Sequence, residues 1–469
     1  MKKIKFLILP VLLVLLCSFT FLIVSALSSN TIVGSKGLTY HLSDDGTYYI
    51  VSDYNYGLSE PDLVIPEEHN GLPVKEIAND AFTEKKWLKS VYIPKSITKI
   101  GHGAFSQTGI TKVYFNAENC QDFDSRNWVF YPNTAQATSI DVIIGKDVKK
   151  VPNRLFYPLS TIPTLNPIIK SITFEEGCIV SSIGDYAFYN IDETATITFP
   201  NSLKTIGEYA FYGNNFTSIN FNDSLEVIDA HAFDNSKQIT SLTFPNSIKE
   251  VKDSAFRNCF NLESVSSESP LYKVISKDTF KYCTKLTNIN LNNVEEIGEA
   301  AFKDCDSLKI VDFPNLNKIC KKAFEGCDGL TKITLDTKLS VIEDEAFYDC
   351  KNVNEIVIKS ANLSDLNASN NAFYNCGTLT TGIKVNVLEG VSKLPKRLFL
   401  STSNTNMQPN IKEIVINSST LKLIDDYAFA SINATVTYVG TKTMWSNVKV
   451  NIGNDTFARV YCVKSLEVE

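Results

Sequence analysis

Short segments in which apolar and polar residues alternate recur along most of the chain. Val91-Tyr92-Ile93 and Ile219-Asn220-Phe221 are two examples. A period of two is typical of a half-buried β-strand, whose outer residues face a core and whose middle residue is exposed. The pattern therefore predicts one short strand in each unit of a repeat.

An Ala-Phe dipeptide, or a close variant, marks the same point of each unit. From Phe188 to Phe347 its spacing stays between 22 and 24 residues when Phe280 is counted. Degenerate copies end at Phe130, Phe156 and Phe399 and raise the number of turns to about fifteen. The other copies end at Phe82, Phe105, Phe211, Phe233, Phe256, Phe302, Phe324, Phe373 and Phe429.

A unit of this length cannot bury its own apolar face, so neighbouring units must stack and complete each other's core. The sequence predicts a single solenoid of parallel short strands in about fifteen turns of roughly 22–30 residues, with a cap at each end. We expect residues 1–26 to be a signal peptide, 27–63 an N-terminal cap, 64–431 the solenoid and 432–469 a C-terminal capping segment.

A second pattern connects each strand to its phenylalanine. Leu88-x-x-Val91-x-Ile93-Pro94-x-Ser96-Ile97-x-x-Ile100-Gly101-x-x-Ala104-Phe105 recurs with few changes from Thr194 to Phe211. We expect the glycines at this point (Gly101, Gly184, Gly207 and Gly298) to form a tight bend, and the small alanine to allow close packing between turns.

These motifs resemble the BspA-like branch of leucine-rich repeat proteins, and the resemblance covers about Val64 to Phe429. Gly37-Leu38-Thr39-Tyr40 is similar to the family's usual opening, and Val436-Thr437-Tyr438-Val439 with Val460-Tyr461-Cys462 is similar to its closing hairpin. The resemblance implies a leucine-rich repeat solenoid that binds other molecules and is exported or attached to a cell surface. It supplies no catalytic residues.

The N-terminus has the features of an export signal. Lys2, Lys3 and Lys5 precede an apolar run from Phe6 to Val24, and Val24-Ser25-Ala26 is a small-residue exit. We therefore expect a secreted or cell-surface, extracellular protein. If the signal is not cleaved, Phe6–Val24 would be an anchor and the one contact with a membrane.

Charge and motifs restrict the classes of function. The chain has 45 Lys and Arg against 52 Asp and Glu, a net charge of −7, and no basic stripe for a nucleic acid. Four scattered histidines and the absence of nucleophile, phosphate-loop or zinc-protease motifs predict no catalytic residue, no cofactor and no metal. A β-solenoid enzyme acting on carbohydrates remains an alternative, since paired carboxylates on neighbouring turns would suffice.

Two further columns follow the repeat. Six cysteines lie three residues after a repeat phenylalanine, and we interpret them as buried free thiols, with a strained disulfide or a metal site as alternatives. They are Cys259, Cys283, Cys305, Cys327, Cys350 and Cys376. Acidic residues lie three before the phenylalanine in many turns, Glu208 and Asp344 among them, and we interpret them as caps of a short helical turn, with calcium binding as the alternative.

The exposed strand positions form the candidate binding surface. In six consecutive turns they carry small neutral groups that can form hydrogen bonds, whereas later turns carry Lys332, Glu355 and Glu413. The neutral residues, called the polar strip below, are Ser171, Thr173, Thr196, Thr198, Ser218, Asn220, Ser241, Thr243, Ser264, Ser266, Asn288 and Asn290. The strip suits recognition of a protein strand or a glycan. Alternatively, these residues only keep an exposed sheet soluble and stable.

Three irregular stretches interrupt the repeat. Insertions at Tyr157–Pro167 and Leu400–Asn410 are expected to emerge as loops, which often carry specificity in solenoids. In the stretch Asn116–Ser139, we expect the cluster of Trp128, Phe130 and Tyr131 to fill the space between unequal turns.

Together these observations predict a binding protein that recognises a protein or glycan on another surface, as in adhesion. A structural envelope or matrix protein that self-associates is the main alternative, and the carbohydrate-active enzyme is the second.

Overall fold

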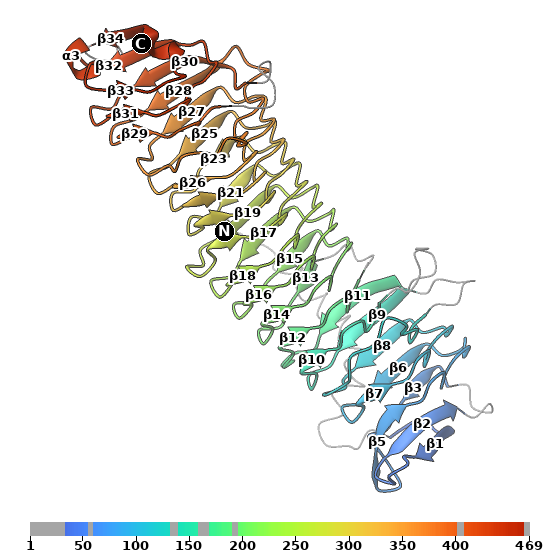
Figure 1. Ribbon diagram of the computed structural model, residues 1–469. Helices are drawn as coiled ribbons and strands as arrows, with labels where there is room; N and C mark the ends of the chain where they lie inside the picture. Colours follow the sequence, from blue (N-terminus) through green and yellow to red (C-terminus); the bar gives the residue numbers. More distant parts are fainter. Residues whose placement is uncertain are drawn as a thin grey trace, which may run out of the picture.

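The protein is one elongated stack of short strands. The strands follow one another in sequence order along the long axis, from β1 (Leu38–Leu42) at one end to β34 (Val460–Val463) at the other (Figure 1). The computed structural model describes residues 33–54, 60–131, 139–157, 168–189, 196–400 and 408–463. It has about 16 turns. The predicted leucine-rich repeat solenoid of parallel strands is thus confirmed, with about one turn more than expected.

Each regular turn contributes a longer strand to one side of the body, which we call the long-strand face. Most neighbouring strands on this face pair in parallel, for example β6 with β8 and β25 with β27. Its strands are β3 (Asp62–Val64), β6 (Ser90–Ile93), β8 (Lys112–Phe115), β9 (Ser139–Ile144), β11 (Ile168–Phe174), β13 (Thr196–Thr198), β15 (Ser218–Asn220), β17 (Ser241–Phe244), β19 (Ser264–Ser267), β21 (Asn288–Asn290), β23 (Ile310–Val311), β25 (Lys332–Leu335), β27 (Glu355–Ile358), β28 (Ile383–Val387), β30 (Ile411–Ile416), β32 (Thr435–Val439) and β34 (Val460–Val463).

A second side, the short-strand face, carries strands of two residues that pair in parallel in the same way. They are β7 (Lys99–Ile100), β10 (Lys150–Val151), β12 (Ser182–Ile183), β14 (Thr205–Ile206), β16 (Val227–Ile228), β18 (Glu250–Val251), β20 (Val274–Ile275), β22 (Glu296–Ile297), β24 (Lys318–Ile319), β26 (Val341–Ile342), β29 (Lys393–Leu394), β31 (Leu423–Ile424) and β33 (Lys449–Val450).

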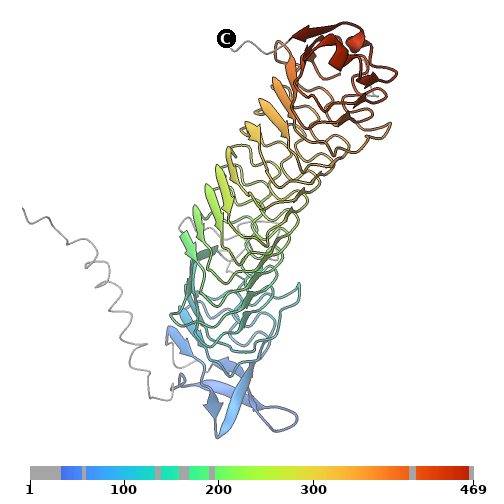
Figure 2. The ribbon, with the colours of Figure 1, turned by 90° about the vertical axis from the view of Figure 1, so that its left-hand side faces the viewer.

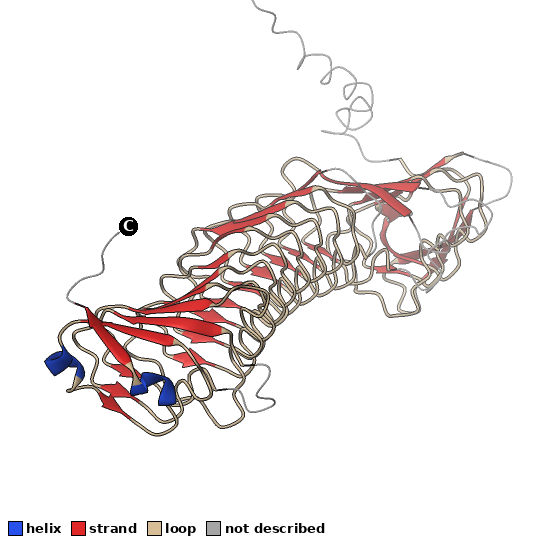
Figure 3. Cartoon of the chain, turned by 90° about the horizontal axis from the view of Figure 1, so that it is seen from above, coloured by secondary structure: helices blue, strands red, loops and turns tan. Residues whose placement is uncertain are grey.

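The ends of the stack differ from its middle. At the N-terminus, β1 (Leu38–Leu42) and β2 (Tyr49–Tyr54) form an antiparallel pair, and β2 is parallel to β5 (Leu72–Ile77), which also pairs with β4 (Glu68–His69). At the C-terminus, β32 and β34 are parallel, so the expected closing hairpin is wrong. The last turn instead contains the helix α3 (Lys442–Trp445) and the 3-10 turn η4 (Asp455–Ala458), the helical segments drawn in Figure 3. The antiparallel N-terminal strands and the curved stack are visible in Figure 2.

The core is a ladder of phenylalanine rings that runs from turn to turn. Rings on successive turns lie 4.8–6.1 Å apart between centroids, from Phe82 through to Phe457. The degenerate copies fit this ladder, since Phe130 lies between Phe105 and Phe156 at 5.5 and 4.8 Å. Because each ring is buried against the rings of the two neighbouring turns, no turn can form a hydrophobic core by itself.

The segment around each phenylalanine is a series of turns, not the short helix that the acidic column suggested. The residue two before the phenylalanine has a positive φ, for example 53° at Tyr209 and 60° at Lys322. Its N–H donates to the next turn's backbone carbonyl three before the phenylalanine, as Tyr186 does to Glu208 at 2.9 Å. The acidic residues therefore accept, through their backbone carbonyls, the hydrogen bonds that join adjacent turns. The prediction that they cap short helices is wrong.

The repeat glycines are needed for close approach and do not have a left-handed backbone. A Cβ atom at Gly298 would lie 2.6 Å from the backbone oxygen of Ile275 in the preceding turn. At Gly207 it would lie 2.8 Å from the backbone nitrogen of Asp185. The expectation that glycine is needed here for a tight bend is therefore wrong. Glycine is needed because the backbone of the neighbouring turn leaves no space for a side chain.

Candidate functional site

The polar strip lies on the long-strand face, on strands β11 to β21. In β13, Thr196 and Thr198 are exposed while Ile197 between them is buried, and β17 repeats this with Ser241, Thr243 and Leu242. Parallel pairing keeps the columns in register within β13–β15 and within β17–β21, because Thr198 lies opposite Asn220 and Ser266 lies opposite Asn290. All twelve predicted residues lie on this one face, with eight exposed and Ser171, Ser218, Ser264 and Ser266 half-buried.

Some rungs of the polar strip are hydrogen-bonded to each other. The Thr196 and Ser218 hydroxyls are 2.5 Å apart, the Asn220 amide donates to Thr198 Oγ1 at 3.2 Å, and Ser266 Oγ donates to Thr243 Oγ1 at 3.3 Å. Such bonds stabilise neighbouring strands, as the alternative interpretation expects. They satisfy one bond for each group and leave further donor and acceptor capacity facing solvent.

The polar strip ends at a hollow in the surface between β19, β21 and β23. The hollow has a volume of about 750 Å³. Ser264, Ser266, Asn288 and Asn290 line it together with residues that the sequence analysis did not select. The strip and the hollow thus form one continuous surface.

Two residues at this hollow were missed by the sequence analysis, Ile310 and Asp312. They occupy the outward positions of the next turn, since Ile310 lies opposite Lys332 in the register of β23 and β25. Ile310 is 55% exposed, which is unusual for isoleucine in this fold. A large aliphatic residue at a position that is polar in the preceding turns was the available signal.

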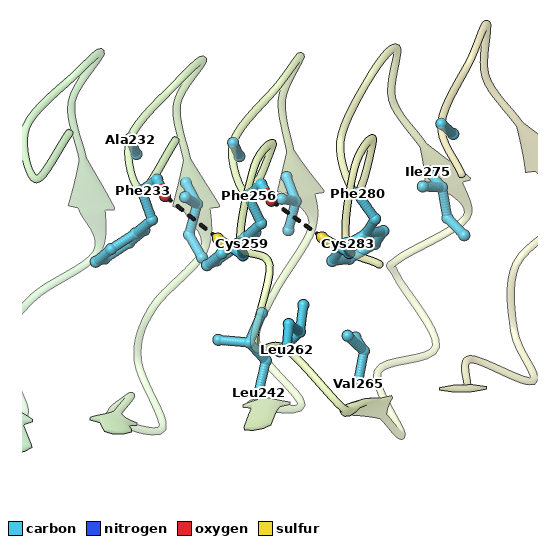
Figure 4. Packing of buried hydrophobic residues seen from close by; sticks show 14 of the residues in the cluster. Ala232, Phe233, Leu242, Phe256, Cys259, Leu262, Val265, Ile275, Phe280 and Cys283 are labelled. Carbon is cyan, nitrogen blue, oxygen red and sulfur yellow. Dashed lines mark hydrogen bonds between the residues drawn. The ribbon is translucent and has the colours of Figure 1, made fainter. Parts of the chain in front are cut away.

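The six repeat cysteines are buried free thiols, as predicted. Each Sγ donates to the backbone oxygen of the phenylalanine in the preceding turn, for example Cys259 to Phe233 at 3.5 Å and Cys283 to Phe256 at 3.4 Å (Figure 4). Burial raises the pKa of Cys283 and of Cys305, which keeps these thiols protonated. Nucleophilic or metal-binding chemistry requires the thiolate, so this column is structural.

The other candidate features give no site. Among the described residues, no group of three or more His, Cys, Asp or Glu is placed to hold a metal ion. Phe130 fills the ring ladder as expected, whereas Trp128 is 46% exposed and stacks on Tyr131. Most of both insertions, at 158–167 and 401–407, and the signal at 1–26 lie outside the described residues. Within the described part of the chain, no helix has the length and apolarity to cross a membrane.

Comparison with known proteins agrees with the repeat. The family model "BspA type leucine rich repeat region (6 copies)" matches residues 62–168, 164–276 and 273–406. No curated protein matches the chain.

Several solved structures are similar. A leucine-rich repeat protein from Bacteroides ovatus is 20% identical over 70% of this chain and 94% of that chain, with a TM-score of 0.39. The pneumococcal vaccine antigen PcpA is 20% identical over 93% and 99%, with a TM-score of 0.42. A leucine rich cell surface protein from Faecalibacterium prausnitzii is 22% identical over 71% and 96%, with a TM-score of 0.34. At these values the classification rests on the family model.

Proposed function

The chain belongs to the BspA-type leucine-rich repeat family, and from this premise we propose that it is an extracellular binding protein that recognises a protein or glycan on another surface. The proposed ligand-binding surface is the polar strip. The long-strand face presents it as a regular array, and solenoids use such extended surfaces for binding through many weak contacts.

The observation that carries the proposal is the change of chemistry along one face. From β13 to β21 the outward positions are neutral, whereas from β25 to β30 they include the ion pairs Lys332–Glu355 at 2.9 Å and Lys384–Glu413 at 3.0 Å. Solubility and sheet stability would be served by either set. A neutral surface with free hydrogen-bonding capacity is the part of the face that can meet a neutral ligand without desolvating charge.

The proposal is tested by binding of the full-length chain to a panel of extracellular matrix proteins and to a glycan array. A triple variant, Thr198→Lys, Asn220→Lys and Thr243→Lys, adds three charges to the polar strip at exposed positions. The control carries Asn201→Lys, Gln238→Lys and Asn246→Lys, which make the same charge change at exposed turn positions.

We expect saturable binding that the strip variant loses and the control variant keeps. Equal binding by both variants would contradict a role of the polar strip. If the panel yields no ligand and the protein self-associates in sedimentation experiments, the structural envelope or matrix function replaces this proposal. No catalytic role is proposed, because the family is a repeat scaffold and supplies no catalytic residues to this chain.

A further inference from the structure

The long-strand face is interrupted between β21 and β23, as it also is between β11 and β13 and between β15 and β17. The break between β21 and β23 is the one that adjoins the hollow. β21 pairs with β19 on one side, and β23 pairs with β25 on the other. Within the described residues, no hydrogen bond joins β21 to β23. On the short-strand face the same two turns remain joined, because β22 and β24 pair in register. The interruption is therefore confined to the face that carries the polar strip.

The interruption leaves strand edges facing each other. The Asn288 N–H donates toward β19, to the Glu263 carbonyl at 3.1 Å, and the Lys309 carbonyl accepts from Thr331 in the next turn at 3.0 Å. Alternate residues of a strand direct their backbone groups to opposite edges. The N–H and C=O groups of Ile289 and Ile310 consequently face the gap, where they need a partner from solvent or from another chain.

The hollow at this gap has both apolar and polar walls. Ile310 is 55% exposed, and the lining also includes Phe313 and the half-buried Ile289. The side chains of Asn288 and Ser264 have no hydrogen-bond partner in the part of the chain that the structure describes. Lys309 and Asp312 are the charged members of the lining and have opposite signs. The surface therefore suits a neutral ligand.

The sequence marks these two turns as different. In a regular turn a corner connects the long strand to the short strand. This corner advances four residues, from Ile93 to Ile97 for example. In the turns of β21 and β23 it advances only three, from Leu291 to Val294 and from Phe313 to Leu316. In some full-length corners a serine contacts the preceding turn, as Ser247 donates to the Leu225 carbonyl at 2.6 Å. In the short corners, an asparagine makes the contact, as Asn315 does to the Asn292 carbonyl at 2.7 Å. The interruption lies between the strands of the two short-cornered turns.

We propose that an extended peptide segment of a partner protein binds in this hollow as an added β-strand. This inference rests on the proposed binding function and specifies its ligand as a protein. The peptide backbone pairs with the free edge groups of Ile289 and Ile310. Its apolar side chains contact Ile310 and the half-buried Ile289, and its polar side chains lie beside Asn288. A glycan fits less well, because Phe313 is 5% exposed and offers no open ring face to a sugar.

The test uses the full-length chain and an array of nonapeptides in which Val, Ile or Phe alternates with Thr, Ser or Asn. Peptides that bind saturably are resynthesised with every second amide nitrogen methylated, in both phases. Methylation removes the N–H groups of one strand edge and leaves the side chains unchanged. We expect binding to weaken roughly tenfold or more in at least one phase. If no array peptide binds, or if the peptides of both methylation phases bind like the parent, strand addition is wrong.

A protein variant locates the site independently. Ile310→Lys changes an exposed side chain in the hollow, and Leu379→Lys makes the same change at a residue that is 67% exposed and lies elsewhere. We expect Ile310→Lys to weaken peptide binding roughly tenfold or more and Leu379→Lys to leave it unchanged. Equal binding by the two variants would place the peptide outside the hollow and overturn the inference.

The two proposals fail separately. If the strip variant loses a matrix protein while no array peptide binds, the binding function stands and strand addition does not. If a glycan binds and Ile310→Lys abolishes that binding, the hollow is a glycan site and the peptide inference is overturned.

Discussion

The turns from Phe188 to Phe233 and those from Phe302 to Phe347 have the same backbone and different exposed chemistry. In both regions the ladder rings stack at the same distance, 5.4 Å for Phe188 and Phe211 and 5.4 Å for Phe302 and Phe324. In both, the residue two before the phenylalanine is left-handed. The difference begins with the side chains that flank the ladder.

In the first region those flanking side chains are aromatic. The rings of Tyr186 and Tyr209 stack at 4.9 Å, those of Tyr209 and His231 at 4.4 Å, and a parallel column pairs Tyr189 with Tyr212 at 4.7 Å. Burial raises the pKa of Tyr186 and of Tyr209. This column is held by ring contacts that do not depend on charge.

In the second region the same positions carry ion pairs. Lys322 lies 3.2 Å from Glu325 and 3.1 Å from Glu345 of the next turn, and Lys303 lies 2.7 Å from Glu325. Burial lowers the pKa of Lys322, but its contacts with Glu345 and Glu325 outweigh this, and the net shift is upward. Because the buried frame is common to both regions, exposed chemistry can change along the solenoid without a change of fold.

The largest expected effect concerns what the two regions share. Phe211→Ala and Phe324→Ala each remove a fully buried ladder ring, and each should lower the free energy of unfolding by about 3–5 kcal/mol. Urea denaturation followed by circular dichroism measures the loss. If either variant keeps the wild-type midpoint, the ladder is not the common core.

A smaller effect is expected where the aromatic column ends, at the buried carboxylate of Asp234. Its Oδ2 accepts hydrogen bonds from Arg257 Nη2 at 2.7 Å and from His231 Nδ1 at 2.9 Å. Its Oδ1 accepts a hydrogen bond from the Asn258 side-chain amide at 3.1 Å. Asp234→Ala should lower the free energy of unfolding by about 1.5–3 kcal/mol. The exposed Asp253→Ala should change it by less than about 0.5 kcal/mol. Equal losses would mean that the buried network contributes nothing.

Salt should separate the two flanking columns. Lys322→Ala should cost about 0.5–1 kcal/mol at low ionic strength and less in roughly 1 M NaCl, because partly exposed ion pairs are screened. Tyr212→Ala should cost about 0.5–1.5 kcal/mol in ring contacts at either salt concentration. Urea denaturation at both concentrations measures this. The same salt response in both variants would remove the distinction between the columns.

The smallest effect is expected at the repeat cysteines. Because burial prevents access and raises the thiol pKa, Cys259, Cys283 and Cys305 should not react with iodoacetamide in the folded protein. The half-buried Cys462 serves as the reactive reference. Peptide mass spectrometry before and after denaturation gives the labelled fraction. Labelling of the column in the native state would contradict its burial.

The sequence predicted the parts of the fold that depend on a repeated residue type. Phe130, Phe156 and Phe399 could be placed in the ladder because only a large apolar residue fits there. The outward direction of Thr198 and Thr243 followed from strand alternation. Both inferences use a period that a single chain displays directly.

The features that depend on contacts between turns could not be predicted. The positive φ at Tyr209 results from the hydrogen bonds that join adjacent turns, and aromatic residues seldom have this conformation. The bond from each cysteine thiol to a phenylalanine carbonyl requires the offset between turns. The interruption beside Ile310 also leaves the strand pattern of its two turns intact, so the alternation of residues does not reveal it.

The central claim is that ligands bind the neutral region of the long-strand face and not its charged region. Thr243 and Thr334 test it directly, since both are threonines at the outward position of the same column, on β17 and β25. A photo-crosslinking residue placed at one or the other should capture the matrix protein that binds in the panel. The account predicts crosslinking from position 243 and none from position 334. Equal crosslinking from both positions, or crosslinking from 334 alone, would contradict it.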